Sequence, residues 1–187
     1  RDLPSFPTRR SSDLMNLNQN ALNQGAAAGA LVVVVKLIAY LIGVEAYMSA
    51  SVGLGSMVFV IAGMCIACIA TRKVDGQLSF REAYFTAWLA AGVATLVVLA
   101  FEVLLFALVD AEMANKVMEF TMDSMENDLS GIMDLPESMV EETKASILWW
   151  SGAQGKALGW LFGLIFWAVI AAIVGAVFKR EVSNVIR

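Results

Sequence analysis

Apolar residues fill four long stretches of the chain, and shorter polar segments separate them. A helix needs about 20 apolar residues to cross a hydrocarbon core about 30 Å thick. The pattern predicts four membrane-spanning helices, over residues 25–44, 51–71, 85–109 and 158–178. Each run is continuous rather than alternating, which indicates a helix and not a strand of a membrane barrel. The expected fold class is therefore all-α, an integral membrane four-helix bundle.

A long polar segment, residues 110–154, joins the third and fourth spans, and we expect it to form a helical excursion outside the membrane. Its first half carries apolar residues at a spacing of three and four, at Ala114, Met118, Met122, Met125 and Leu129. This spacing predicts an amphipathic helix, which Gly131 ends. The methionines are better suited to packing that helix than to binding copper, because no copper-like ligand cluster accompanies them.

A second helix is predicted to start near Asp134–Glu137, where an acidic cap precedes a proline in the first turn. Its apolar stripe lies at Met139, Val140, Thr143 and Ile147. Trp149 and Trp150 close the segment, as in the aromatic belt of a membrane interface.

Basic residues indicate the orientation of the spans. Lys and Arg gather in the 72–82 loop and in the C-terminal tail, whereas the 45–53 turn and the 110–154 segment are mainly acidic. Basic residues near span ends stay in the cytoplasm. We therefore expect cytoplasmic termini and an extracytoplasmic 110–154 segment. Lys156, just beyond that segment, weakly opposes this orientation.

Residues 1–14 resemble the translation of a sequencing-library adapter joined in frame before Met15. Arg9-Arg10 also invites a twin-arginine or secretory signal, but such signals need an apolar stretch close behind, and residues 15–20 are polar. We expect residues 1–14 to be a non-native leader and residues 15–187 to form one membrane domain.

Composition narrows the classes of function. The chain is 59% hydrophobic and 16% charged, with a net charge of −4 and no histidine. No basic face indicates nucleic-acid binding, and histidine is the commonest general base and metal ligand. No catalytic or phosphate-cradling motif is present. We expect no enzyme activity, no cofactor and no metal.

Cys65 and Cys68 have CxxC spacing inside the second span. A zinc site usually needs four ligands, and a redox centre would need a thioredoxin-like setting. We interpret both cysteines as small apolar residues of a membrane helix.

Lys36 and Glu102 are ionisable residues within predicted spans, Lys36 near the middle of the membrane. Such residues cost about 2.5–3.5 kcal/mol on insertion scales and are often functional. We hypothesise that they pair across the first and third spans. The pair could serve a polar pathway or an ion-coupled site, or it could only lock the packing; separate snorkelling to the interface is the remaining interpretation.

Glycines at a spacing of four residues form ridges that let membrane helices approach closely. One ridge, Gly25 and Gly29, enters the first span, and another, Gly155, Gly159 and Gly163, enters the fourth. They could pack helices within one subunit or between subunits.

The 72–82 loop ends in Ser79-x-x-Glu82, which predicts a capping box that starts the third span's helix. The pattern Gly76-x-x-Ser79-Phe80-x-Glu82-Ala83, with the four-span layout and the long segment between spans three and four, resembles the bacterial membrane family called domain of unknown function 4199. That resemblance implies the four-helix membrane fold and a location in the bacterial inner membrane, but no activity.

The expected function is that of a non-enzymatic membrane component that binds a partner or a lipid through the acidic outer helices. The alternative is a small transporter or channel subunit that uses Lys36 and Glu102. The expected surroundings are the lipid bilayer and a second copy of the chain or another membrane protein, with no nucleic acid.

Overall fold

The computed structural model describes residues 11–75, 78–110, 112–129 and 137–179, and these form helices with no strand among them. The elements are α1 (Ser11–Ile42), α2 (Val44–Met48), α3 (Ala50–Asp75), α4 (Phe80–Leu104), the π-helical turn η1 (Leu105–Val109), α5 (Met113–Leu129), α6 (Glu137–Ser151) and α7 (Ala153–Phe178).

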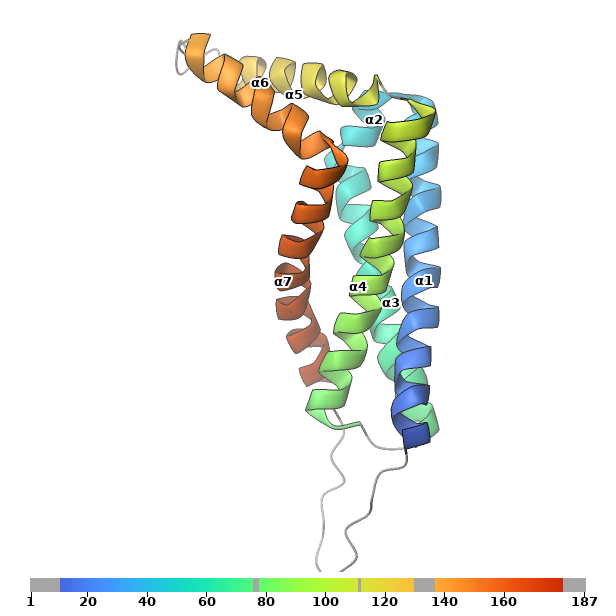
Figure 1. The fold of residues 1–187 in the computed structure, drawn as a ribbon. Helices are drawn as coiled ribbons and strands as arrows, with labels where there is room; N and C mark the ends of the chain where they lie inside the picture. The colour runs from blue at the N-terminus through green and yellow to red at the C-terminus, as the bar shows by residue number, and fades with distance from the viewer. Residues whose placement is uncertain (1–10, 76–77, 111, 130–136, 180–187) are drawn as a thin grey trace, which may run out of the picture.

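Four of these helices contain stretches long and apolar enough to cross a membrane, at Gln19–Ile42, Ala50–Arg72, Phe80–Val109 and Ala153–Phe178. α5 and α6 lie across one end of the bundle, while α1 begins and α7 ends at the other end (Figure 1). The chain is therefore a multi-pass membrane protein, and the predicted all-α four-helix bundle is confirmed. The predicted leader, residues 1–14, lies partly outside the described residues. The predicted start signal at Asp134–Pro136 lies wholly outside them.

Small residues bring α1, α3 and α4 close together. A Cβ on Gly25 would lie 2.5 Å from the carbonyl oxygen of Ala90, and one on Gly29 would lie 2.7 Å from that of Ala94. α1 and α4 thus meet backbone to backbone at this first glycine ridge. Such contact is how membrane helices gain packing energy where lipid tails are as apolar as the side chains.

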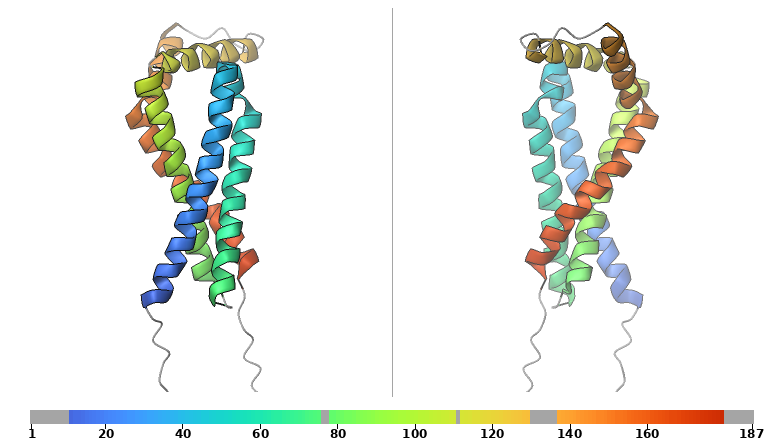
Figure 2. Two further views of the ribbon diagram at one scale, coloured as in Figure 1. Left: turned by 90° about the vertical axis from the view of Figure 1, so that its right-hand side faces the viewer. Right: turned by 90° about the vertical axis from the view of Figure 1, so that its left-hand side faces the viewer.

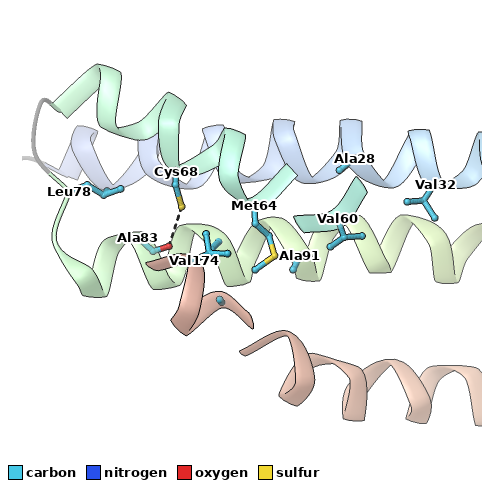
Figure 3. Packing of buried hydrophobic residues seen from close by; sticks show 12 residues of the cluster. Ala28, Val32, Val60, Met64, Cys68, Leu78, Ala83, Ala91 and Val174 are labelled. Atoms are coloured by element: carbon cyan, nitrogen blue, oxygen red, sulfur yellow. Dashed lines mark hydrogen bonds between the residues drawn. The ribbon is translucent and has the colours of Figure 1, made fainter. Parts of the chain in front are cut away.

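The core between α3 and α4 contains Met64, Val60 and the predicted apolar cysteine Cys68 (Figure 3). The Cys68 thiol donates a hydrogen bond of 3.5 Å to the carbonyl oxygen of Ala83. Cys65 packs against the same cluster, and neither sulfur forms a disulfide. The position of both sulfurs agrees with the apolar interpretation of the CxxC pair.

Two indoles join α7 to α4. Trp88 donates a hydrogen bond of 3.1 Å to the carbonyl oxygen of Leu164, and Trp160 donates one of 3.0 Å to the hydroxyl of Thr95. Farther along, a Cβ on Gly175 would lie 3.0 Å from the backbone nitrogen of Tyr84. α7 therefore contacts α4 through the face that carries Trp160, Leu164 and Gly175.

The second glycine ridge does not pack a neighbouring helix along its length. Gly155 is buried under the backbone of Trp149 and Trp150, but a Cβ on Gly159 would meet only the Trp150 ring at 3.7 Å. A Cβ on Gly163 would meet no atom within 4 Å. Gly159 and Gly163 lie one position off the face that α7 turns toward α4, so Gly163 packs against no described residue of this chain, and packing between subunits is the alternative that stays open for it.

The first, third and fourth spanning stretches begin at residues 19, 80 and 153, earlier than the predicted 25, 85 and 158. The first span ends at Ile42, because Gly43 has a φ of 144°, which side chains rarely adopt. The expected turn after it contains the short helix α2. The third span changes to π-helical geometry at Leu105, which the hydrophobic pattern did not predict.

Candidate functional site

Three charged side chains meet near the end of the bundle that α5 and α6 cover. Lys36 of α1 donates a hydrogen bond to Glu102 Oε1 on α4, so the predicted pair is present. Lys156 of α7 donates to the other oxygen, Glu102 Oε2, at 3.1 Å. All three side chains are largely buried, with exposed fractions of 19%, 18% and 14% for Lys36, Glu102 and Lys156.

The site lies toward one end of the membrane-spanning stretches. Lys36 is six residues before the end of α1, a rise of about 9 Å along a helix. Glu102 lies in the last turn of α4, and Lys156 lies in the first turn of α7. The three residues therefore lie near one end of the bundle, and the expectation that Lys36 lies near the middle of the membrane stays a prediction.

Two aromatic rings flank the ammonium groups. Lys36 Nζ lies 5.1 Å from the ring centroid of Tyr47, and Lys156 Nζ lies 4.0 Å from that of Phe106. Both distances suit cation–π attraction. Phe106 belongs to the π-helical turn η1, a geometry that occurs often at functional sites. Tyr47 belongs to α2, the short helix that Gly43 allows to turn back over the bundle.

Tyr47 is the second unusual group of the site. The residue is only 7% exposed, and its hydroxyl makes no well-aligned hydrogen bond to a described residue, although the Glu102 carboxylate lies close to it. Burial raises the pKa of Tyr47, and the nearby Glu102 carboxylate raises it further. The phenol therefore remains protonated and can act as a hydrogen-bond donor.

A cavity of about 420 Å³ contains these groups, and Lys36, Tyr47, Glu102 and Lys156 all line it. The pair α1 and α3 diverges from the pair α4 and α7 toward the end that α5 covers (Figure 2). Lys36 contributes from the first pair, and Glu102 and Lys156 contribute from the second. The three charges therefore join the two helix pairs beside the cavity.

α5 forms part of the lining through Val117 and Thr121, and α6 adds Ile147 and Trp150. The buried positions of α5 are Met113 and Val117, which pack with Tyr47 and Leu105. Each of these buried residues thus lies one position before a residue of the predicted stripe, Met113 before Ala114 and Val117 before Met118.

Met118 and Met122 of that predicted stripe are only half-buried, and the side chain of Met125 is outside the described part. At these described positions the buried face of α5 is offset by one residue from the predicted stripe, because the end of α4, and not a flat bilayer, determines which face of α5 is covered.

Asp110 fixes the start of α5. It accepts hydrogen bonds from Lys116 at 2.7 Å, from the Tyr40 hydroxyl at 3.3 Å and from the backbone N–H of Glu112 at 3.1 Å. The hydrogen bond from Lys116 is the largest cause that lowers the pKa of Asp110. The same hydrogen bond raises the pKa of Lys116. This network holds α5 against α1 beside the cavity.

The remaining predicted residues lie elsewhere. Ser79 and Glu82 form the expected capping box, with the Glu82 N–H 3.4 Å from Ser79 Oγ and the Ser79 N–H 3.0 Å from Glu82 Oε2. They start α4 at the opposite end from Glu102. Within the described ranges, no group of three or more Asp, Glu, Cys or His side chains could hold a metal ion.

Lys156 and Tyr47 are the site residues that sequence reasoning missed. Lys156 has a visible signal, because it lies two residues before the predicted fourth span, but in the sequence it bears only on the orientation of the spans. Tyr47 had none, because tyrosine at a membrane surface is common. Together the four side chains can attract charge and donate hydrogen bonds within a cavity.

Comparison with known proteins gives a family and nothing beyond it. The model of the family described as protein of unknown function, DUF4199, matches residues 23–180. No curated protein and no solved structure matches the chain. The matched range takes in the four spans and the three charged residues of the site, and the chain belongs to the DUF4199 family.

Proposed function

We propose that this chain is a non-enzymatic protein of the bacterial inner membrane that binds a small polar molecule or a lipid headgroup. The observation that carries the proposal is the cavity of about 420 Å³ that holds Lys36, Glu102 and Lys156. Cavities of about 300–1,000 Å³ with a few convergent polar groups are typical ligand sites. Ionisable groups inside membrane segments are rare and often functional.

The outer helices have a different part in this proposal from the one first expected of them. Their acidic faces were expected to bind a partner. Their apolar faces instead contribute Val117, Thr121, Ile147 and Trp150 to the cavity lining. This placement supports a role as the cover of a binding site.

In the proposed orientation, α5 and α6 lie on the extracytoplasmic side of the membrane. Arg72 ends the second spanning stretch, Arg81 lies in the first turn of α4, and Lys179 follows α7, all at the end opposite α5 and α6 (Figure 1). Basic residues at span ends favour the cytoplasmic side. Cytoplasmic termini and an extracytoplasmic cavity follow from this orientation.

A pair of glycine variants tests whether the cavity binds anything. Gly53 lines the cavity and Gly55 does not, yet a Cβ added at either meets no atom within 4 Å. Gly53→Phe should therefore fill the cavity without a backbone clash, and Gly55→Phe is the matched control. Native mass spectrometry of protein purified in mild detergent should show a bound molecule on the wild type and on Gly55→Phe, and none on Gly53→Phe. A bare wild-type protein, or equal retention by both variants, would contradict the proposal.

A transporter or channel subunit is the second candidate. It is favoured by the position of the three charges, which come from three spanning helices and join the two diverging helix pairs. Solute flux into proteoliposomes that Lys36→Leu abolishes and Lys179→Leu preserves would support it. Ligand binding without any flux would favour the binding protein.

A further inference from the structure

We infer that the ligand of this cavity presents a phosphodiester group, a single negative charge on two free oxygens, held by Lys36, Lys156 and Tyr47. The inference rests on the proposed function of the cavity as a binding site. It adds the chemical class of the ligand.

The first support is the charge of the lining. Among the described residues that line the cavity, two are basic, Lys36 and Lys156, and one is acidic, Glu102. Glu102 can balance only one ammonium, so the lining carries one excess positive charge. Charges removed from water are costly unless they are paired. A ligand with one negative charge would complete the set.

The second support is the Tyr47 hydroxyl. It is buried, belongs to a residue that lines the cavity, and makes no well-aligned hydrogen bond in the described part of the chain, although the Glu102 carboxylate lies close to it. Buried polar groups nearly always have a partner, so an exception calls for one. A raised pKa keeps this phenol protonated, which makes it a donor to an anionic oxygen. Each lysine ammonium also has three donors, and each is seen to use one on Glu102.

The third support is the position of the cavity. Trp150 lines it with its side chain 44% exposed, and exposed tryptophans are enriched at the level of lipid headgroups. A phosphodiester carries one negative charge, whereas a phosphate monoester carries about 1.5 to 2 and would overcompensate the lining. A phosphodiester can come from an anionic phospholipid or from a soluble headgroup.

The test uses the full chain in nanodiscs of phosphatidylcholine, whose headgroup has no net charge. Phosphatidylglycerol, glycerophosphoglycerol and laurate are titrated separately, and binding is read by native mass spectrometry. We expect phosphatidylglycerol to bind at least about 10-fold more tightly than laurate. Tyr47→Phe should weaken that binding about 10-fold, because it removes one hydrogen bond to a charged group. Lys156→Met should abolish it, because the lining then carries no excess charge.

Two matched controls are available. Tyr84→Phe makes the same change at the opposite end of α4, and Lys179→Met removes a lysine that follows α7 at that end and does not line the cavity. Both should bind phosphatidylglycerol as the wild type does. Tyr47→Phe removes a single oxygen, so it keeps the test decisive if Lys156→Met fails to fold.

The outcomes separate the two proposals. Phosphatidylglycerol binding that Tyr47→Phe and Lys156→Met leave unchanged, or laurate binding of equal strength, would overturn the phosphodiester assignment. The cavity would still be a binding site if Gly53→Phe blocked its ligand. No binding of any probe and no co-purified molecule would overturn both. Glycerophosphoglycerol binding as tight as that of the lipid would assign the soluble source, and binding of the lipid alone would assign the bilayer.

Discussion

Lys156 donates its hydrogen bond to Glu102 Oε2, the carboxylate oxygen that Lys36 does not use. One carboxylate on α4 therefore joins lysines from α1 and α7. The two bonds are not equivalent to two independent salt bridges, because both ammoniums depend on the same negative charge. Removal of the Glu102 carboxylate and removal of one lysine should therefore change the free energy of unfolding by different amounts.

Glu102→Gln should lower the free energy of unfolding by about 3 kcal/mol, because it leaves two largely buried ammoniums without a counter-charge. Lys36→Met should cost clearly less, since Lys156 still neutralises Glu102. Thermal unfolding of the purified proteins in one detergent would rank them. Equal melting temperatures for Glu102→Gln and wild type would show that the three charges are solvated rather than buried.

Lys156 should also change the result of the double exchange Lys36→Glu with Glu102→Lys. For an isolated pair, exchange of the two charges should restore stability. Here the new lysine at position 102 would face Lys156 and repel it, so little restoration is expected. Restoration should appear when Lys156→Glu is added, measured as folded protein by detergent size-exclusion chromatography. Full restoration by the double exchange alone would mean that Lys156 contributes little.

The fold could be predicted because its signals are local. Each span is a long apolar run, and the cap at Ser79 and Glu82 needs only residues three apart. The pairing of Lys36 with Glu102 could also be predicted, because a charge within an apolar membrane segment is costly and two opposite charges reduce that cost by pairing.

The cavity could not be predicted in the same way. Its existence depends on the angle at which two helix pairs diverge, on the turn at Gly43 and on the π-helical turn that carries Phe106. None of these three features produces a periodic pattern of apolar residues that could be read from the sequence. The glycine ridges show the same limit, because spacing identifies a ridge but only the packing shows that Gly29 is covered and Gly163 is not.

The capping box gives a prediction that is independent of the cavity. Ser79→Ala should lower stability by about 1 kcal/mol, because the Glu82 N–H loses its side-chain acceptor. Ligand retention at the other end of α4 should be unchanged. Ser79→Thr is the control, since it keeps the hydroxyl. An alanine variant that is fully stable yet has lost its ligand would contradict a purely structural role.

The network at Asp110 predicts a pH range for the attachment of α5. The pKa of Asp110 lies below its ordinary value of 3.8, and that of Lys116 lies above its ordinary value of 10.5. Stabilisation by Asp110 is complete above 3.8 and is lost as pH falls through the lowered pKa. Stabilisation by Lys116 is complete below 10.5 and is lost as pH rises through the raised pKa.

Hydrogen exchange of α5 amides, corrected for intrinsic rates, should therefore show constant protection between about pH 4 and pH 10. Protection should fall outside that range. Asp110→Asn should lower protection within it and flatten the dependence at the acidic end. A wild-type midpoint near neutral pH would mean that another group controls the attachment.

The proposed orientation can be checked with topology reporters. Fusions of a green fluorescent protein at the C-terminus should fluoresce, and alkaline phosphatase inserted at Gly76 should be inactive, because both sites are expected in the cytoplasm. Phosphatase inserted after Leu129 should be active. Phosphatase activity at Gly76 would reverse the proposed orientation and place the cavity on the cytoplasmic side.

The two glycine ridges give a matched pair of substitutions. Gly29→Ala would place a methyl group 2.7 Å from the Ala94 carbonyl oxygen and 2.9 Å from Val97 Cβ, so α1 and α4 must separate. We expect a loss of about 1–3 kcal/mol, typical of overpacking. Gly163→Ala meets no atom within 4 Å and should be neutral or stabilise by about 0.5–1 kcal/mol through helix propensity. Melting temperatures of the two variants in one detergent test this order. If Gly163→Ala is as damaging as Gly29→Ala, its ridge must be covered by something other than this chain, and a second copy could be detected by a change in oligomeric mass.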